Sequence, residues 1–102
     1  MARRLTIAEA ALADLEAART WLTQDGAGDK ARQRLVAIRE AILALRDTPR
    51  MWPVKDHPGI RQRAVAGYSI AYRLTPDTGT DRTSGDVEII RVFGPYQDRS
   101  EI

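Results

Sequence analysis

The spacing of the apolar residues changes once along this chain, at a proline-rich connector between residues 48 and 59. Before the connector, apolar residues recur every three or four positions, which is typical of one face of an α-helix. After it they alternate with polar residues, which is typical of a β-strand. This order predicts an α+β fold. Since 102 residues suffice for one hydrophobic core, we expect a single domain over residues 1–102.

Two helices are predicted before the connector. The segment Thr6-Ile7-Ala8-Glu9 fits a capping box, so the first helix should begin there. Glycines at positions 26 and 28 end it, and Asp29 can cap a second helix over residues 30–46. The short loop between them favours an antiparallel helical hairpin. The apolar stripes are Ala8, Ala11, Leu12, Leu15, Ala18 and Leu22 in the first helix, and Ala31, Leu35, Ile38, Ile42 and Leu45 in the second, which Val36 and Leu43 widen.

Three strands are predicted after the connector. Residues 60–65 and 68–74 read as a hairpin around Ala66-Gly67, and the alternation in the second strand indicates that it is half-buried. A polar loop over residues 75–85 leads to residues 87–93, whose apolar side chains would face both ways, so this strand should be central. We expect the helical hairpin to pack on one face of a small, mainly antiparallel sheet. Residues 3–6 are too short to judge by periodicity and leave room for one more short strand.

The composition excludes several classes of function. With no cysteine and one histidine, the chain has no disulfide framework, no cysteine nucleophile and no histidine-rich metal centre, so we expect no metal and no cofactor. No apolar run is long enough to span a membrane or resembles a signal peptide, so we expect a cytoplasmic protein. The common nucleotide-binding and hydrolase motifs do not occur.

Arginine is unusually frequent, at 14 of the 16 basic residues. Residues 55–75 carry four basic groups and one acidic group, whereas residues 76–102 carry three basic and six acidic groups. This pattern argues against a broad nucleic-acid surface and confines any phosphate binding to the predicted strands. Guanidinium groups there can hold a phosphodiester and stabilise charge at phosphorus. Alternatively they are ordinary solvated residues, or pair with Asp86, Glu88 and Asp98. The strand arginines are Arg61 and Arg63, which should share a face, Arg73 and Arg91.

The sequence resembles the RelE/ParE toxin superfamily. Residues 58–73, PGIRQRAVAGYSIAYR, and residues 87–98, VEIIRVFGPYQD, are similar to the family's G-[IL]-R strand, Y-x-I-x-Y-R strand, I-x-R-V segment and terminal Q-D. The predicted helical hairpin, which opens at Leu5-Thr6 and carries Ala-x-x-Asp-Leu at residues 11–15, resembles the family's start. The resemblance therefore spans nearly the whole chain and implies the fold of that superfamily.

The resemblance also implies a bacterial type II toxin. ParE-like members inhibit DNA gyrase, whereas RelE-like members cleave mRNA in the ribosomal A site with basic residues and a terminal tyrosine or histidine. The Y-x-I-x-Y-R strand is more similar to ParE, and Phe93-Gly94-Pro95 stands where many relatives have a histidine. We therefore expect a gyrase inhibitor rather than an enzyme. The alternatives are a ribosome-dependent endoribonuclease and a relic that only binds an antitoxin. The catalytic candidates of the nuclease alternative are Arg61, Arg73, Arg91 and Tyr96.

A cognate antitoxin is the partner that the resemblance implies. We expect a ParD-like protein, of ribbon-helix-helix type, that forms a hetero-oligomer with the toxin. Family antitoxins wrap a segment around the helical hairpin and the sheet. Apolar residues beside the core stripes can line that groove, and arginines at a spacing of seven can give it a basic border for antitoxin carboxylates. These candidates are Trp21, Leu22, Val36 and Leu43, and the arginines Arg32, Arg39 and Arg46.

Overall fold

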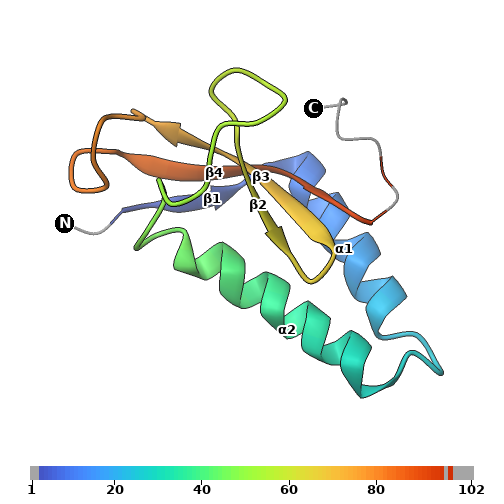
Figure 1. The fold of residues 1–102 in the computed structure, drawn as a ribbon. Coiled ribbons are helices and arrows are strands. Elements are labelled where there is room, and N and C mark those ends of the chain that lie inside the picture. Colours follow the sequence, from blue (N-terminus) through green and yellow to red (C-terminus); the bar gives the residue numbers. More distant parts are fainter. Residues whose placement is uncertain (1–2, 96, 98–102) are drawn as a thin grey trace.

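The structure is a computed structural model that describes residues 3–95 and residue 97. Its elements are β1 (Leu5–Ile7), α1 (Glu9–Leu22), α2 (Gly28–Ala44), β2 (Arg61–Val65), β3 (Tyr68–Thr75) and β4 (Asp86–Phe93). The strands form one sheet in the order β1-β4-β3-β2, in which β1 is parallel to β4 and the other neighbours are antiparallel. The two helices cover one face of the sheet (Figure 1). The predicted α+β fold, a helical hairpin on a mainly antiparallel sheet, is confirmed.

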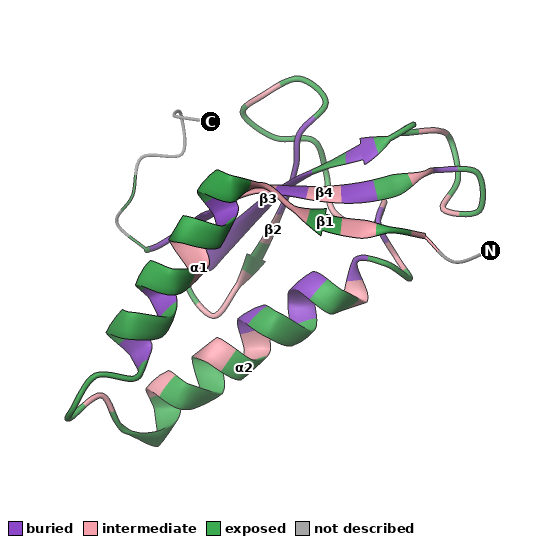
Figure 2. Cartoon of the chain, turned by 180° about the vertical axis from the view of Figure 1, so that it is seen from behind, coloured by how far each residue is buried: buried purple, intermediate pink, exposed green. Residues whose placement is uncertain are grey.

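The main core lies between the helices and the sheet, and the buried sides of both helices face it (Figure 2). Alternate side chains of β3 point toward the helices, because neighbouring residues of a strand face opposite sides. Removal of these apolar side chains from water is the principal stabilising contribution. The buried residues of this core are Ala11, Ala18, Leu22, Ile38, Ala41, Ile42, Leu45, Tyr68, Ile70, Tyr72, Leu74, Val87, Ile89 and Val92.

The second face of the sheet carries a smaller core. Ile60, Ala71 and Phe93 are buried there, and Ile90 packs against them. The prediction that β3 is half-buried is therefore wrong for residues 68–72, all of which are buried. The connector brings Ile60 onto this face, which alternation within one strand cannot reveal. The central position predicted for β4 is confirmed, with β1 on one side and β3 on the other.

The β2–β3 hairpin follows its local sequence. Val65 pairs with Tyr68 across Ala66 and Gly67, as predicted. The φ angles of 51° and 82° at these two positions are the positive values that a type I′ turn requires. Gly67 adopts such an angle without a steric penalty, because it has no Cβ.

The start of the chain differs from the prediction. Thr6 lies in β1 and pairs with Glu88, so no capping box forms. The helix begins at Glu9, and the preceding Ala8 offers no side-chain cap. The Ala8 amide instead donates to the Ile89 oxygen at 2.9 Å, which keeps the chain attached to the sheet until the helix starts. Pairing with β4, about eighty residues away, overrides the local capping signal.

The second helix is also shifted from its predicted range. It begins at Gly28 after Ala27, so Asp29 lies in the first turn and does not cap the helix. The helix ends at Ala44, because the amides of the next two residues bond to oxygens three positions back and tighten the last turn. No helix in the described part of the chain is long and apolar enough to cross a lipid bilayer.

Candidate functional site

An apolar groove of about 590 Å³ lies between the two helices and the edge strand β1. The helices diverge from their connecting turn, and β1 lies at the open end (Figure 2). Leu5 and Ile7 of β1, Leu15 of α1 and Ile38 and Ile42 of α2 supply much of the apolar lining. Because β1 is the edge of the sheet, its outer side pairs with no other strand of residues 3–95. The groove can thus offer a partner both apolar side chains and a strand edge.

Three of the residues predicted for antitoxin contact line this groove. Val36 and Leu43 are 53% and 49% exposed, which is high for aliphatic side chains. Arg39 lies between them along α2, and its side chain is exposed. These residues widen the apolar surface of α2 beyond its packed stripe, so they are available to a partner.

The other predicted contact residues lie elsewhere. Leu22 is buried in the main core and is not available to a partner. Trp21 is 65% exposed but is not part of the groove lining. Arg32 on α2 and Arg46 in the turn after the helix are exposed outside the lining, and the Arg32 guanidinium lies 3.1 Å from the Asp29 carboxylate.

Basic and apolar residues alternate along the exposed side of α2 and into the turn that follows it, where Arg46 lies. The spacings between them are four, three, four and three residues, which keeps them in one line on a helix and is the seam spacing of packed helices. We call this line the α2 stripe; it consists of Arg32, Val36, Arg39, Leu43 and Arg46.

The sequence did not indicate the contribution of β1 to the groove. Leu5 and Ile7 alternate with exposed Thr6, which is the only local signal of a strand there. Three residues are too few for that alternation to be decisive. The lining residues Leu15 and Leu35 were assigned to the core stripes, and both are partly buried against the core as well.

The arginines of the sheet do not form a single site. Arg61 pairs across the strands with Tyr72, so it shares the helix-facing side with the tyrosine, whereas Arg73 points to the opposite face. Arg63 pairs with Ile70, so the prediction that Arg61 and Arg63 share a face is confirmed.

Arg61 forms an ion pair with Asp77 and also bonds to the connector. Its Nε lies 2.8 Å and its Nη2 3.0 Å from the two carboxylate oxygens of Asp77, and Nη1 donates to the Trp52 oxygen at 2.6 Å. The hydrogen bond from Arg61 holds the pKa of Asp77 below its usual value, and the same bond raises the pKa of Arg61. Burial raises the pKa of the neighbouring Tyr72 hydroxyl to about 12, and that hydroxyl donates to the Pro49 oxygen.

Arg91 and Arg73 also lie beside carboxylates. The Arg91 guanidinium donates twice to Asp14 of α1, at 2.7 and 3.1 Å. Asp14 also accepts the Val92 amide at 2.8 Å, beyond the point where β1 stops pairing with β4. The carboxylate therefore satisfies part of the strand edge that β1 leaves open. Arg73 lies 3.6 Å from Glu88 in an exposed pair, an arrangement anticipated for the strand arginines.

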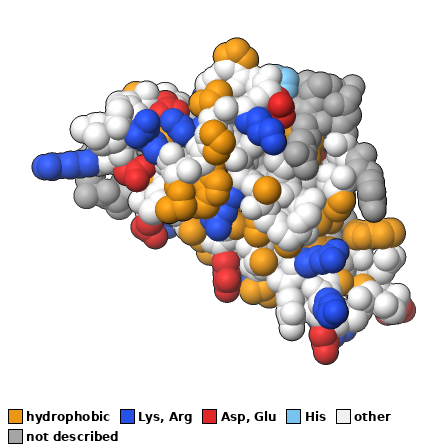
Figure 3. All heavy atoms as spheres, in the orientation of Figure 1, with side chains coloured by type: hydrophobic (Ala, Val, Ile, Leu, Met, Phe, Trp, Pro, Cys, Tyr) orange, Lys and Arg blue, Asp and Glu red, His pale blue; other side chains and the backbone are white. Residues whose placement is uncertain are grey.

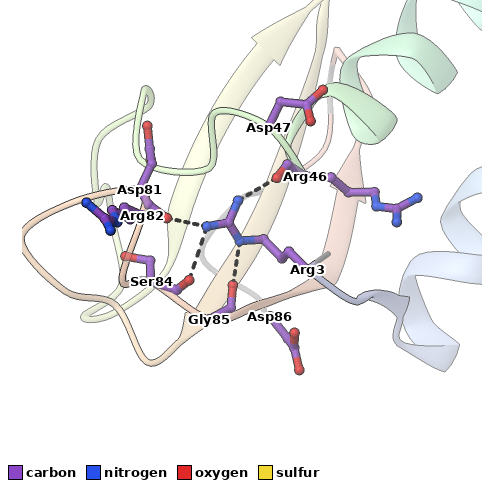
Figure 4. A pocket seen from close by; sticks show the side chains of 8 residues that line it. All are labelled: Arg3, Arg46, Asp47, Asp81, Arg82, Ser84, Gly85 and Asp86. Carbon is purple, nitrogen blue, oxygen red and sulfur yellow. Dashed lines mark hydrogen bonds between the residues drawn. The ribbon is translucent and has the colours of Figure 1, made fainter. Parts of the chain in front are cut away.

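Further guanidinium groups bond to backbone oxygens. Arg3 donates to Gly85 at 2.7 Å, to Ser84 at 3.1 Å, and to Arg46 and Asp81 (Figure 4). These bonds use four of the five guanidinium N–H donors. The pocket that Arg3 lines is therefore a structural junction rather than a ligand site.

Arg63 caps the end of α2. It donates to the Ala41 oxygen at 2.9 Å, close to the tightened last turn. Its guanidinium also stacks on the Trp52 ring at 4.0 Å. We call these contacts the arginine junction, made of Arg3, Arg61 and Arg63 with the backbone oxygens that they bond.

The candidate catalytic side chains of the sheet do not converge on one point in the described part of the chain. Among residues 3–95 and 97, no group of three histidine, cysteine, aspartate or glutamate side chains could hold a metal ion. Stabilisation of charge at phosphorus requires donors that converge on one point. Arg61 and Arg73 face opposite sides of the sheet, and Tyr96 lies outside the described residues.

Comparisons with known proteins agree with this fold. Comparison with curated protein sequences finds no significant match. One similar solved structure is described as a chromosomal ParDE TA system from P. aeruginosa. It has 21% sequence identity and a TM-score of 0.64, over 90% of this chain and 95% of that chain, and supports the fold. A model of the ParE toxin of the type II toxin-antitoxin system parDE matches residues 5–95. Since this match covers most of the sequence, the chain belongs to the ParE toxin family of type II toxin-antitoxin systems.

Proposed function

We propose that this protein inhibits DNA gyrase by binding it, and that a cognate ParD-like antitoxin neutralises it. Membership of the ParE toxin family supports the role of a toxin. The placement of the sheet arginines favours binding over catalysis. Arg61 and Arg73 lie on opposite faces, and Arg61, Arg73 and Arg91 each lie beside a carboxylate.

A ribosome-dependent endoribonuclease is the weaker alternative. To converge on one phosphate, Arg61 would have to leave Asp77 and Arg91 would have to leave Asp14. Both pairs are well shielded, since the four side chains are between 10% and 24% exposed. Loss of one partner leaves a charge without its counter-ion; the cost is about 3 kcal/mol or more in a fully buried pair and smaller in these partly exposed ones. A nuclease would have to recover that cost on binding RNA.

The helical groove is the proposed antitoxin site. An amphipathic segment can bury its apolar side chains against Leu15, Ile38 and Ile42, which is a common mode of peptide recognition. The α2 stripe then borders that segment with arginines, so carboxylates on the antitoxin would be favoured over lysines. Toxin and antitoxin would thereby form a hetero-oligomer.

The gyrase proposal is tested with purified toxin freed of antitoxin. Gyrase, ATP and relaxed plasmid are mixed with increasing toxin, and supercoiling and cleaved DNA are measured on gels. We expect stoichiometric toxin to stop supercoiling and to trap cleaved DNA, and added antitoxin to restore supercoiling. Unchanged supercoiling at equal concentrations of toxin and gyrase would contradict the proposal.

A parallel experiment tests the nuclease alternative. After toxin induction without antitoxin, primer extension on translated mRNA should show no cuts at ribosomal A-site codons. An authentic RelE-like toxin, induced in the same strain, is the positive control. A-site cuts that depend on Arg61 or Arg91 would support the nuclease and refute the binding mechanism.

A further inference from the structure

The connector displays two apolar side chains that the groove does not account for. Met51 is 65% exposed and Val54 is 46% exposed, and neither lines the groove. They flank Trp52 and Pro53, so four successive nonpolar residues lie at the surface or close to it. In the space-filling view, hydrophobic side chains gather where the connector runs, with basic side chains among them (Figure 3). Exposed apolar patches with polar borders are typical of interaction sites.

The backbone that carries these side chains is held in place although it has almost no regular secondary structure. The Trp52 oxygen accepts from Arg61 at 2.6 Å, and the Pro53 oxygen accepts the Gln62 amide at 3.1 Å. Val54 forms an isolated bridge with Arg61, which extends the sheet beyond β2 for one residue. A segment anchored in this way loses little conformational freedom on binding, so a partner pays little to order it.

The charges around this patch are two basic groups and one exposed carboxylate, Asp56, which accepts from the Gln62 side chain at 3.0 Å. The Arg63 guanidinium stacks on the Trp52 ring at 4.0 Å, and the exposed Lys55 follows Val54 directly. The nearby Asp77 carboxylate is already paired with Arg61. Tryptophan, methionine and arginine are also the residue types that interfaces concentrate. A complementary partner therefore presents an apolar pocket bordered by carboxylates.

We propose that the connector patch, made of Met51, Trp52, Val54 and Lys55, docks the protein target of the toxin. This inference rests on the proposed function, in which the toxin acts by binding a protein. The patch and the groove share no residue, so on this proposal target and antitoxin would contact different surfaces. An antitoxin seated in the groove would then neutralise by its bulk rather than by competing for the same side chains.

The test separates toxicity from antitoxin binding. The double variant Met51→Ser, Val54→Thr and the single variant Lys55→Glu are induced without antitoxin, and growth arrest is followed. Leu12→Ser is the matched control, because Leu12 is 50% exposed and lies outside both surfaces. We expect both patch variants to need about tenfold more toxin for arrest. Their antitoxin affinity should stay within about twofold of wild type, and the control should behave as wild type.

Each outcome decides the proposal. Full arrest by both patch variants overturns it, as does a parallel loss of antitoxin affinity in both. If thermal unfolding shows that the double variant is not folded, full growth arrest by Lys55→Glu is by itself enough to overturn the proposal. Supercoiling assays with the same proteins separate the two proposals. If wild type arrests growth without inhibiting gyrase, gyrase is the wrong target while the growth comparison still tests the patch. If wild type does not arrest growth, there is no target to dock and the patch proposal fails.

Discussion

The groove and the arginine junction both involve the C-terminal half of α2, but they are built on different principles. The groove is made by side chains of regular elements and keeps aliphatic groups such as Val36 and Leu43 open to solvent. The junction is made by guanidinium groups, and each of them is occupied by backbone oxygens or by a carboxylate. The groove leaves apolar side chains exposed to solvent, whereas the guanidinium groups of the junction are bonded within the chain.

This difference changes the meaning of the arginine-rich composition. A guanidinium can donate several hydrogen bonds in a planar fork, so one arginine can join carbonyl groups from different segments. Arg3 joins the region before β1, the end of α2 and the β3–β4 loop in this way (Figure 4). Lysine, which presents one point charge, could not replace it. Several arginines of this chain therefore stabilise the fold rather than form a phosphate-binding site.

The largest expected effect comes from crowding the junction at Gly85. A Cβ there would lie 2.0 Å from the Thr75 oxygen, so Gly85→Ala must displace backbone. We expect a loss of about 3 kcal/mol or more in the free energy of unfolding, measured by denaturant titration. Gly79→Ala in the same loop is the control, because its Cβ meets nothing within 4 Å. Equal stability of the two variants would show that the junction tolerates rearrangement.

The next effect distinguishes a shielded arginine from an exposed one. Arg61→Met removes the donor of the Trp52 oxygen and leaves Asp77 with Arg50 at 3.6 Å, so we expect a loss of about 2 kcal/mol in unfolding free energy. Arg73→Met, which removes an exposed pair with Glu88, should change stability by about 0.5 kcal/mol or less. A similar loss in both variants would contradict the distinction between the two arginines.

The Arg61 pair also has a defined pH dependence. Because Arg61 lowers the pKa of Asp77, the pair stabilises the protein above the ordinary carboxyl pKa, near 3.8. That contribution is lost as the pH falls through the lowered pKa. The stability difference between wild type and Arg61→Met should therefore shrink in acid, which denaturant titrations at pH 7 and below pH 4 can measure.

A smaller effect is expected on the groove side. Arg39→Glu places a carboxylate in the basic border and should weaken antitoxin binding by about tenfold, measured by calorimetry. Arg34→Glu is the control, because Arg34 is an exposed residue of the same helix outside the groove lining. Both variants should unfold at the same temperature as wild type. Unchanged affinity of Arg39→Glu would count against a basic border.

The smallest effect concerns Tyr72 beside the junction. Its folded pKa of about 12 lies above the ordinary value of 10.0, so its protonated form stabilises the protein fully below pH 10. This contribution declines between pH 10 and 12 as the unfolded chain ionises first. Tyr72→Phe loses the hydrogen bond to Pro49, worth about 1 kcal/mol at pH 7, but should lose less stability over that alkaline range. Denaturant titrations across this range check it.

Elements with local signals were predicted well. The β2–β3 hairpin was visible because alternation and a two-residue turn occur within one short segment. The short strand β1 was predicted only as a possibility, because its partner in β4 lies far along the chain and its own three residues carry little pattern. The same distance explains the mistaken capping box at Thr6, where strand pairing replaced a favourable local bond.

The candidate site was predicted in part for the same reason. Val36, Arg39 and Leu43 were identified because they lie beside the apolar stripe of one helix. Leu22 was misplaced, since a residue at the end of a stripe can face either the core or the surface. Asp14 gave no signal of its role, because its bonds to Arg91 and Val92 connect a helix to a strand about eighty residues away.

The sequence by itself determined the α+β order, the helical hairpin and the toxin family, because periodicity and motif order are properties of neighbouring residues. Only the tertiary structure decided which arginines are free. Ion pairing depends on distances between segments remote in sequence, such as Arg61 with Asp77 or Arg91 with Asp14. Because of these ion pairs, arginines that were candidates for phosphate binding stabilise the fold instead. The groove and the connector patch remain as the surfaces open to partners.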